Sequence, residues 1–221
     1  MESTQSGRPL RSDAMRNHEQ LLAAARDVVV ERGAGAPLEE VARRAGVGIA
    51  TLYRRFPSRT VLLRAVVVDA LQRTAAAAAD ALAQEGTGFA ALIRYMHAAL
   101  DLRISAVIPT VLDTLDLEDD EVRAAREVSA GLAQRIVDAA HADGTLASDV
   151  TFGDIGTLLV RLSRPLPGSI PPAVDAQLAH RHLDLLVDGL RLAPGRPLPS
   201  GPGLEREDLR SYRSAPGAGT S

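Results

Sequence analysis

The sequence contains no cysteine and no tryptophan, and only 3% of its 221 residues are aromatic. Without thiols the chain forms neither disulfides nor thiolate metal sites, and a reducing cytoplasmic compartment is the expectation. Lysine is missing as well, since all 25 basic residues are arginine. Because alanine is also very frequent, we interpret this usage as the mark of a GC-rich genome and not of a function.

Long hydrophobic runs and targeting signals are absent from the sequence too. No apolar stretch approaches the roughly 20 residues that a membrane-spanning helix requires. The start of the chain, MESTQSGRPLRSD, has no apolar core of the kind found in signal peptides. We therefore expect a soluble, cytoplasmic protein without a membrane partner, long enough for a small domain and a larger one.

The sequence shows no motif of an enzyme. It has no nucleophile elbow, Walker-type phosphate loop, dinucleotide-binding glycine pattern or HExxH zinc motif. None of the five histidines has metal-ligand spacing to another: His18, His97, His141, His180 and His182. The acidic cluster 117–121 (LEDDE) is interpreted as a helix N-terminus, where carboxylates oppose the positive end of the helix dipole; a metal site is the weaker alternative. We predict no catalytic residue, no metal and no cofactor.

The charge of the chain is unevenly distributed. The formal net charge is −3, but residues 1–64 hold 11 arginines against 7 acidic residues, a net of +4. The remainder holds 14 arginines against 21 acidic residues, a net of −7. A basic first part favours a nucleic-acid partner for that part of the chain.

Within the basic part, residues 38–63 have the spacing of two short helices joined by a tight turn. Apolar residues at i, i+3, i+4 and i+7 line one face of the first helix: Leu38, Val41, Ala42 and Ala45. The pattern stops at Gly46, which permits a turn at positive φ. In a second helix from about Ile49, Leu52 and Phe56 lie on the buried side. Its polar side carries Thr51, Arg54 and Arg55, and such a side fits a DNA major groove.

This stretch resembles the signature of the TetR family, written G-V-S-x-G-T-L-Y-x-[HY]-F-x-[ST]-K-x-x-L. The matching residues are Gly46, Val47, Thr51, Leu52, Tyr53, Phe56, Ser58 and Leu62. The departures are Gly48 in place of Ser, Ala50 in place of Gly and Arg59 in place of Lys. The first removes a hydroxyl that caps a helix or contacts a phosphate, whereas Arg59 keeps the positive charge.

The resemblance implies a sequence-specific DNA-binding transcriptional regulator that binds a palindromic operator. We expect DNA contacts from Arg44, Gly48, Ile49, Thr51, Tyr53, Arg54, Arg55 and Arg59. Of these, Thr51, Tyr53 and Arg59 are predicted to meet phosphates, and Arg54 or Arg55 to reach base edges or flanking phosphates.

The rest of the chain is predicted to be helical as well, which makes the fold class all-α with about nine helices. We expect helices near 18–32, 58–84, 89–100, 105–115, 122–144, 151–164 and 173–192. The predicted division is a flexible arm (1–17), a three-helix helix-turn-helix domain (18–64), a ligand-binding and dimerisation bundle (65–193) and a disordered tail (194–221). The tail is assigned to disorder because ten of its 28 residues are Gly or Pro.

For the bundle, the resemblance implies a homodimer and a pocket for a small apolar or amphipathic ligand that releases a repressor from DNA. The candidate ligand residues are Phe89, Tyr95, Met96, His97, Arg103 and Phe152, for which plain core packing is the alternative. The candidate dimer residues are Leu158, Leu178, His182, Leu185 and Leu186. The rival function is a protein-interaction module whose helix-turn-helix is kept only as scaffold, without a ligand switch.

Overall fold

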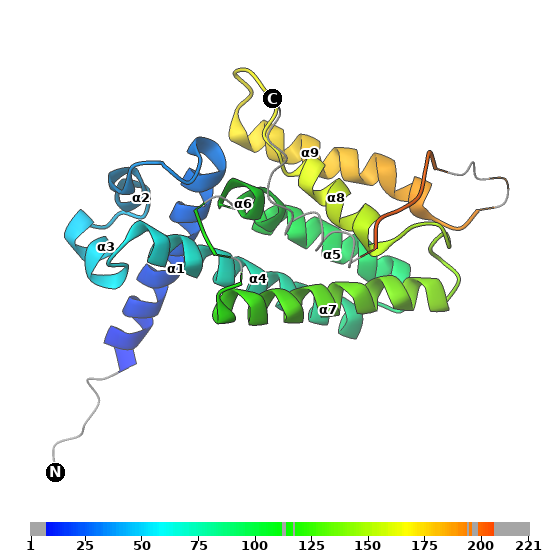
Figure 1. Cartoon of the computed structure of the whole chain (residues 1–221), viewed down its shortest axis with the longest axis horizontal. Coiled ribbons are helices and arrows are strands. Elements are labelled where there is room, and N and C mark those ends of the chain that lie inside the picture. Colours follow the sequence, from blue (N-terminus) through cyan, green and yellow to red (C-terminus); the bar gives the residue numbers. More distant parts are fainter. Residues whose placement is uncertain (1–7, 112–113, 117, 194, 196–198, 206–221) are drawn as a thin grey trace, which may run out of the picture. The chain divides into compact units, whose positions relative to one another are not determined.

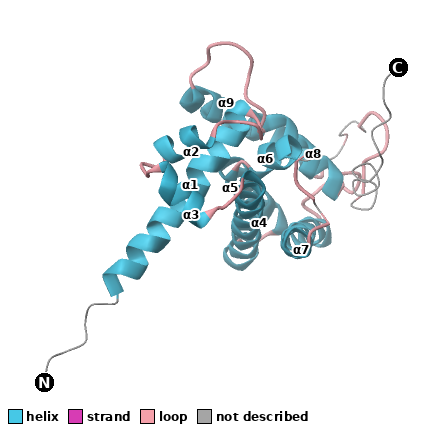
Figure 2. Cartoon of the chain, turned by 60° about the vertical axis from the view of Figure 1, so that its left-hand side comes forward, coloured by secondary structure: helices cyan, strands magenta, loops and turns pink. Residues whose placement is uncertain are grey.

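The structure of the chain is a computed structural model that describes residues 8–111, 114–116, 118–193, 195 and 199–205 (Figure 1). Within these residues there are nine α-helices, one short 3-10 helix and no β-strand, so the predicted all-α class is confirmed (Figure 2). The helices are α1 (Arg8–Arg32), α2 (Leu38–Arg44), α3 (Ile49–Arg55), α4 (Arg59–Gln84), α5 (Gly88–Leu102), α6 (Ile104–Val111), α7 (Asp120–Ala142), α8 (Phe152–Leu162) and α9 (Pro172–Val187), followed by η1 (Asp188–Leu190). None of these helices is both long and apolar enough to cross a membrane.

The chain divides into two compact units. Unit 1 consists of residues 1–71 and 106–126, and unit 2 of residues 72–105 and 127–221. The predicted helix-turn-helix domain, 18–64, lies entirely within unit 1. Helix α6 and the first turns of α7 group with unit 1 as well, although the sequence had assigned them to the second domain.

The core of unit 1 is built from the apolar faces of its first four helices. Fully or almost fully buried side chains are Leu21, Ala25, Val28, Val41, Ala42, Leu52, Phe56, Leu62 and Val66. Burying each of the larger ones contributes about 1.5–3 kcal/mol. Of the positions that the helical spacing placed on inner faces, Leu38, Val41, Ala42, Leu52 and Phe56 are buried, whereas Ala45 is only half-buried.

Two helix starts in unit 1 show why the predicted boundaries held or failed. Ser58 caps α4 as predicted, since its Oγ accepts from the backbone N–H of Val61 at 3.3 Å. Helix α1 begins at Arg8, however, and not near His18. The predicted arm 1–17 is therefore helical from Arg8 on, because no residue between 10 and 32 stops a helix, and residues 1–7 lie outside the described part.

Unit 2 has a separate apolar core formed by α5, α8, α9 and parts of α4 and α7. Its largest fully buried side chains include Phe89, Leu92, Met96, Ile136, Leu146 and Leu183. Helix α5 contacts both α8 and α9, and α8 contacts α9 (Figure 1). The alanines of α4 take part in this core, since Ala78 and Ala81 are fully buried.

Capping groups fix the helix ends of unit 2. Thr87 accepts from the N–H of Ala90, and Asp143 accepts from the N–H of Gly88 at 2.6 Å. Thr151 and Asp154 form a reciprocal capping box at the start of α8. These bonds satisfy backbone donors that have no partner inside their helix.

The C-terminal segment departs from its prediction. Residues 199–205 are described, and the Oγ1 of Thr151 donates to the carbonyl oxygen of Leu204 at 2.9 Å. The expectation that nothing beyond residue 193 folds with the domain is thus wrong for this stretch, because a Gly- and Pro-rich chain can still be held by backbone contacts. Residues 194, 196–198 and 206–221 of the predicted tail lie outside the described part.

Candidate nucleic-acid interface

The turn between α2 and α3 has the geometry that the sequence predicted. Gly46 has φ +68°, a left-handed conformation that costs glycine little and strains other residues. Val47 follows with its N–H bonded to the carbonyl of Ala42 at 3.0 Å. Gly48 is the residue that caps α3, and it supplies no side-chain hydrogen bond. In the first turn of α3, the N–H of Thr51 bonds to the carbonyl of Gly48 at 2.9 Å, whereas the N–H groups of Ile49 and Ala50 have no acceptor among the described residues.

Helix α3 is fixed by a buried side and presents its other side to solvent. Leu52 is fully buried, and Phe56 is buried with the His18 ring of α1 stacked on it at a centroid distance of 5.7 Å. On the outer side Tyr53 is 46% exposed, and Ile49, Arg54 and Arg55 are exposed as well. Thr51 is half-buried. The helix thus holds a rigid outward row of one aromatic and two cationic side chains.

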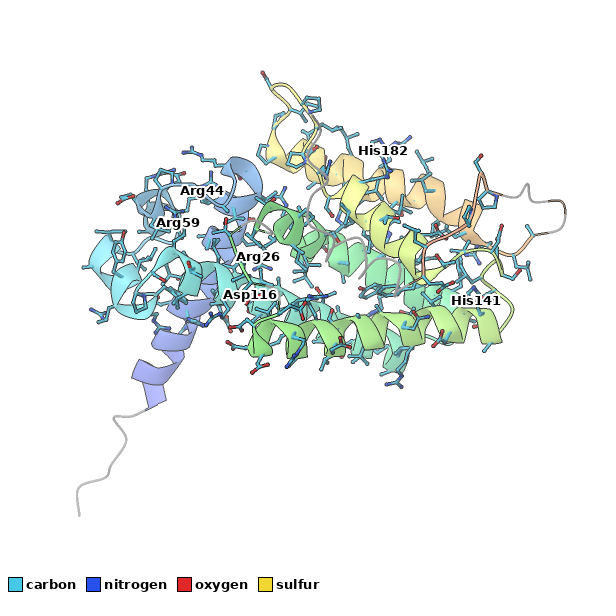
Figure 3. The ribbon with its side chains drawn as sticks, viewed as in Figure 1. Arg26, Arg44, Arg59, Asp116, His141 and His182 are labelled. Atoms are coloured by element: carbon cyan, nitrogen blue, oxygen red, sulfur yellow. The ribbon has the colours of Figure 1, made fainter. Side chains whose placement is uncertain are left out.

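Arg44, a predicted DNA contact, is held by acidic side chains of its own unit. Its guanidinium donates to both carboxylate oxygens of Glu31, at 2.8 and 2.5 Å, and to Glu40 at 3.1 Å (Figure 3). The hydrogen bond with Glu31 raises the pKa of Arg44 further above its usual value. This arginine is locally neutralised and ties α2 to the end of α1.

Glu40 is the centre of that ion-pair cluster. It also accepts two bonds from Arg43, at 2.7 and 2.9 Å. The hydrogen bonds from Arg43 and Arg44 lower the pKa of Glu40 to about 2. The i, i+3 and i, i+4 spacing of Glu40 with the two arginines is visible in the sequence, but the contribution of Glu31 is not.

The side chain of Arg59 is also hydrogen-bonded within unit 1. Its Nη1 donates to the backbone carbonyls of Ala34 and Ala36, at 2.9 and 2.5 Å (Figure 3). The side chain therefore fastens the start of α4 to the α1–α2 loop, and fewer of its five N–H groups remain for a phosphate. Sequence reasoning missed this role, because no local pattern indicates a carbonyl more than 20 residues away.

Arg54 is the predicted contact with the greatest freedom. It is exposed, and it forms no hydrogen bond or ion pair with the part of the chain that the structure describes. Together with the exposed Tyr53 and Arg55 and the half-buried Thr51, it forms a polar, cationic side of α3, and a helix side of this composition can enter a major groove. We call these four residues the α3 face.

The predicted ligand residues are distributed between core and contacts in unit 2. Phe89, Tyr95 and Met96 are buried in its apolar core, with Phe152 packed against that core. Burial raises the pKa of Tyr95 to about 12. Arg103 ends α5 in a left-handed conformation, φ 53°. His97 does not stand in isolation, because its ring is hydrogen-bonded to His180 of α9.

The predicted dimer residues fall mainly on one side of α9. Leu185, His182 and Leu186 are exposed, and Leu178 and, on α8, Leu158 are half-buried. With 100° per residue, Val174, Leu178, His182 and Leu185 share one side of α9. The buried side chains of α9, Leu183 and Val187, lie on the opposite side. An apolar strip is therefore left on the outside of the helix.

Comparison with known proteins agrees with these features. The sequence profile of the bacterial regulatory proteins of the tetR family matches residues 21–66. The TetR transcription regulatory protein from Mycobacterium vanbaalenii is 31% identical over 83% of this chain and 100% of its own, with a TM-score of 0.59. The TetR transcriptional regulator SCO0520 from Streptomyces coelicolor is 30% identical over 78% of this chain and 97% of its own, with a TM-score of 0.56.

A third solved structure shares the fold at lower identity. The TetR-like transcriptional regulator LfrR from Mycobacterium smegmatis, in complex with proflavine, is 22% identical over 78% of this chain and 96% of its own, with a TM-score of 0.56. No curated protein sequence matches the chain.

Proposed function

This chain belongs to the TetR family of bacterial transcriptional regulators, and on that basis we propose that it acts as a homodimeric repressor, released from a palindromic operator by a small apolar or amphipathic ligand. Family membership makes it a DNA-binding regulator and not an enzyme. The operator, the dimer and the ligand are the parts that we propose.

The α3 face is the observation that carries the proposal for DNA. A helix that served only as scaffold has no need of exposed Tyr53 and of two adjacent exposed arginines. Arg54 is the best candidate for a base edge, since it has no partner among the described residues, and Thr51 and Tyr53 are the candidates for phosphate contacts. Arg44 and Arg59 support the interface indirectly, because their donors hold α2 and α4 around α3.

Because a glycine caps α3, backbone N–H groups of this helix are also candidates for a DNA phosphate contact. The N–H groups in the first turn, at Ile49 and Ala50, have no side-chain acceptor from Gly48. A phosphate at this position would accept from them and interact with the positive end of the helix dipole. The phosphate oxygens would then be the hydrogen-bond acceptors in place of the missing serine hydroxyl.

The outer strip of α9 supports the homodimer. Leu185 is 66% exposed, the adjacent Leu186 is exposed, and Val174 is exposed about three turns earlier in α9. Contiguous apolar surface of this kind is rare on monomeric proteins. A second copy offers the same strip, so that a two-fold contact buries both. The helix-turn-helix domains of the two copies would then bind half-sites about 34–36 Å apart, or a multiple of this spacing.

The ligand part of the proposal rests on the family and on the core of unit 2. The proflavine complex of LfrR is a property of that protein, and it supports a pocket in this fold. A ligand releases DNA only if it binds the DNA-incompetent conformation more tightly. A typical coupling of about 1–3 kcal/mol corresponds to a 5- to 150-fold loss of operator affinity.

The proposal is tested by selecting operator sequences from random DNA and footprinting the preferred one. We expect a two-fold symmetric site and a loss of footprint when Leu185→Glu disrupts the dimer. Val128→Glu is the matched control, since Val128 is an exposed apolar residue on α7, away from the α9 strip. The rival, an interaction module with a vestigial head, predicts no sequence preference in this selection. A Leu185→Glu chain that is monomeric and still protects the full site at the same concentration would contradict the dimer.

A further inference from the structure

Two histidines of unit 2 meet across the contact between α5 and α9. The Nδ1 atoms of His97 and His180 are 2.8 Å apart. The two ring planes differ by only 3°, and the ring centroids are 5.1 Å apart. In each ring the centroid lies a fixed distance from Nδ1. The distance between the centroids equals the Nδ1–Nδ1 distance plus this distance for both rings, which is possible only if centroids and Nδ1 atoms lie on one line. The rings therefore lie end to end, with their Nδ1 atoms facing each other. This is the geometry of a linear N–H···N hydrogen bond.

The other nitrogen of each ring faces a carboxylate of the opposite helix. His97 Nε2 lies 3.1 Å from an oxygen of Asp184, and His180 Nε2 lies 2.9 Å from an oxygen of Asp101. Each helix thus supplies a histidine and, four residues later, an aspartate. The crossed pairing requires antiparallel helices, and it gives a continuous chain Asp184–His97–His180–Asp101.

The carboxylate partners fix where two of the protons of this Asp–His–His–Asp array lie, and they leave the two Nδ1 atoms to share the rest. A carboxylate only accepts, so each Nε2 must carry a hydrogen. With no further proton, two Nδ1 lone pairs face each other at 2.8 Å and repel. With one further proton, one Nδ1 donates to the other, and the pair carries one imidazolium. With two, a pair of N–H groups and two positive charges face each other.

We propose that His97 and His180 form a single proton-binding site that clasps α5 to α9, and that loss of the shared proton or gain of a second one opens the clasp. The contact between the rings differs for each number of bound protons, so the site acts as a pH-sensitive switch. Because one histidine lies on α5 and the other on α9, the shared proton joins the two helices.

No other group among the described residues is bonded to the two rings. Asp101 is the facing charge from α5 and Asp184 the one from α9, and both carboxylates are largely exposed. Arg94 of α5 is paired with Glu85 instead. On α9, Arg181 and His182 are exposed, and α8, which contacts both helices, supplies no partner to the rings. A metal ion does not fit between nitrogens 2.8 Å apart, since each Zn–N bond needs about 2.0–2.1 Å along the line of the lone pair.

The clasp contributes to the attachment of α9, because few apolar side chains of this helix are buried. Leu183 and Val187 are its only buried residues within the described part of the chain, and they share the inner side of α9 with His180 and Asp184. Loss of the His97–His180 bond removes the central one of the three polar contacts that these four side chains make between α5 and α9. Under the proposed function, α9 carries the dimer strip, so the proton site then connects pH to dimerisation; the clasp itself does not depend on that function.

The direct test is nitrogen NMR on the full chain, with ¹⁵N-labelled histidine, between pH 5 and 9. We expect a scalar coupling between His97 Nδ1 and His180 Nδ1 through the shared hydrogen, and a strongly deshielded proton between them. Both signals should vanish at each end of the range. Absence of the coupling at every pH would overturn the proposal, whether or not the protein binds DNA.

Variants separate the clasp from ordinary histidine titration. His97→Gln and His180→Gln should each abolish the coupling. They should also lower the amide protection factors of Leu183 and Val187 in α9, and make these protection factors independent of pH between 5 and 8. The control is His141→Gln, because among the described residues the ring of His141 is bonded to the carbonyl of Ala147 and not to another histidine. This variant should keep the wild-type coupling and the wild-type pH dependence of the protection factors. Equal pH profiles in wild type and in folded His180→Gln would contradict a switch.

A metal outcome is tested in the same samples. Wild type is compared after chelation with EDTA and after addition of one equivalent of Zn²⁺. The proposal expects the same coupling and the same melting temperature in the chelated sample. A melting temperature that rises with Zn²⁺ in wild type but not in His97→Gln, with loss of the coupling, would identify a metal site and overturn the proton assignment.

Discussion

Gly153 at the start of α8 lies so close to Leu204 that a Cβ on the glycine would overlap the Leu204 carbonyl oxygen. Thr151 donates to the same oxygen. Gly203 also packs closely on Thr151 and Asp154, although with more room than at Gly153. The C-terminal segment is therefore seated on the α8 capping box, and two glycines permit the approach.

We predict that Gly153→Ala displaces this segment and lowers the free energy of unfolding by about 1–3 kcal/mol, the usual cost of overpacking. Gly156→Ala, in the same helix with open space around it, should be neutral or stabilising by up to about 1 kcal/mol. Urea unfolding measures both. In a chain ended after residue 193, Gly153→Ala should lose its penalty. An equal penalty with and without the segment would show that the contact with Leu204 is not its cause.

Arg54 and Arg59 should separate DNA binding from stability. Arg54→Ala is expected to leave the unfolding free energy within about 0.5 kcal/mol of wild type. It should weaken operator binding by about 1–3 kcal/mol if Arg54 reaches a base, or reduce the salt slope by about one if it reaches a phosphate. Arg59→Ala should destabilise unit 1 by about 1–3 kcal/mol, since it leaves two carbonyls without their donor.

The two measurements for this pair are urea unfolding and operator affinity against salt. Arg59→Ala is expected to lose affinity only in proportion to its unfolded fraction. Unchanged DNA affinity in both Arg54→Ala and Arg55→Ala would remove the α3 face from the interface.

Glu40 should account for part of the acid sensitivity of unit 1. Its pKa is lowered from 4.5 to about 2 by Arg43 and Arg44. A lowered folded-state pKa means that its stabilisation is present above pH 4.5 and is lost as the pH falls towards 2. Glu40→Gln is therefore expected to flatten the stability profile between pH 4.5 and 2, followed by circular dichroism. The exposed neighbour Glu39→Gln should keep the wild-type slope, and a wild-type slope in Glu40→Gln would refute the assignment.

Tyr95 should account for part of the stability that unit 2 loses at alkaline pH. Burial raises its pKa from 10 to about 12. The stabilisation is thus complete below pH 10 and is lost as the pH rises towards 12, because the unfolded chain releases the phenolic proton first. A shift of about two pKa units corresponds to about 3 kcal/mol. Tyr95→Phe should be less sensitive to alkali by about this amount, whereas the exposed Tyr53→Phe should not differ from wild type in urea unfolding at pH 9 to 12.

The sequence alone determined the helix-turn-helix of this protein. The positions of Leu52, Phe56 and Gly46 follow from helical spacing and from the conformational freedom of glycine, both of which act within a few residues. The TetR signature is equally local, so that the family and the exposed α3 face could be predicted before any coordinates. The helical bundle and its apolar side chains, Phe89 and Met96 among them, followed from the same periodicity.

Only the tertiary structure decided which partners the polar side chains have. Arg44 and Arg59, predicted as DNA contacts, are bonded to Glu31 and to loop carbonyls, and the segment around Leu204 is held although its composition indicates disorder. The two H-x-x-x-D spacings on α5 and α9 were visible in the sequence, but 83 residues separate His97 from His180. Periodicity states which side of a helix a residue occupies and not which other helix covers that side. Hydrogen bonds between distant elements are set by packing, so they appear only when the chain is folded.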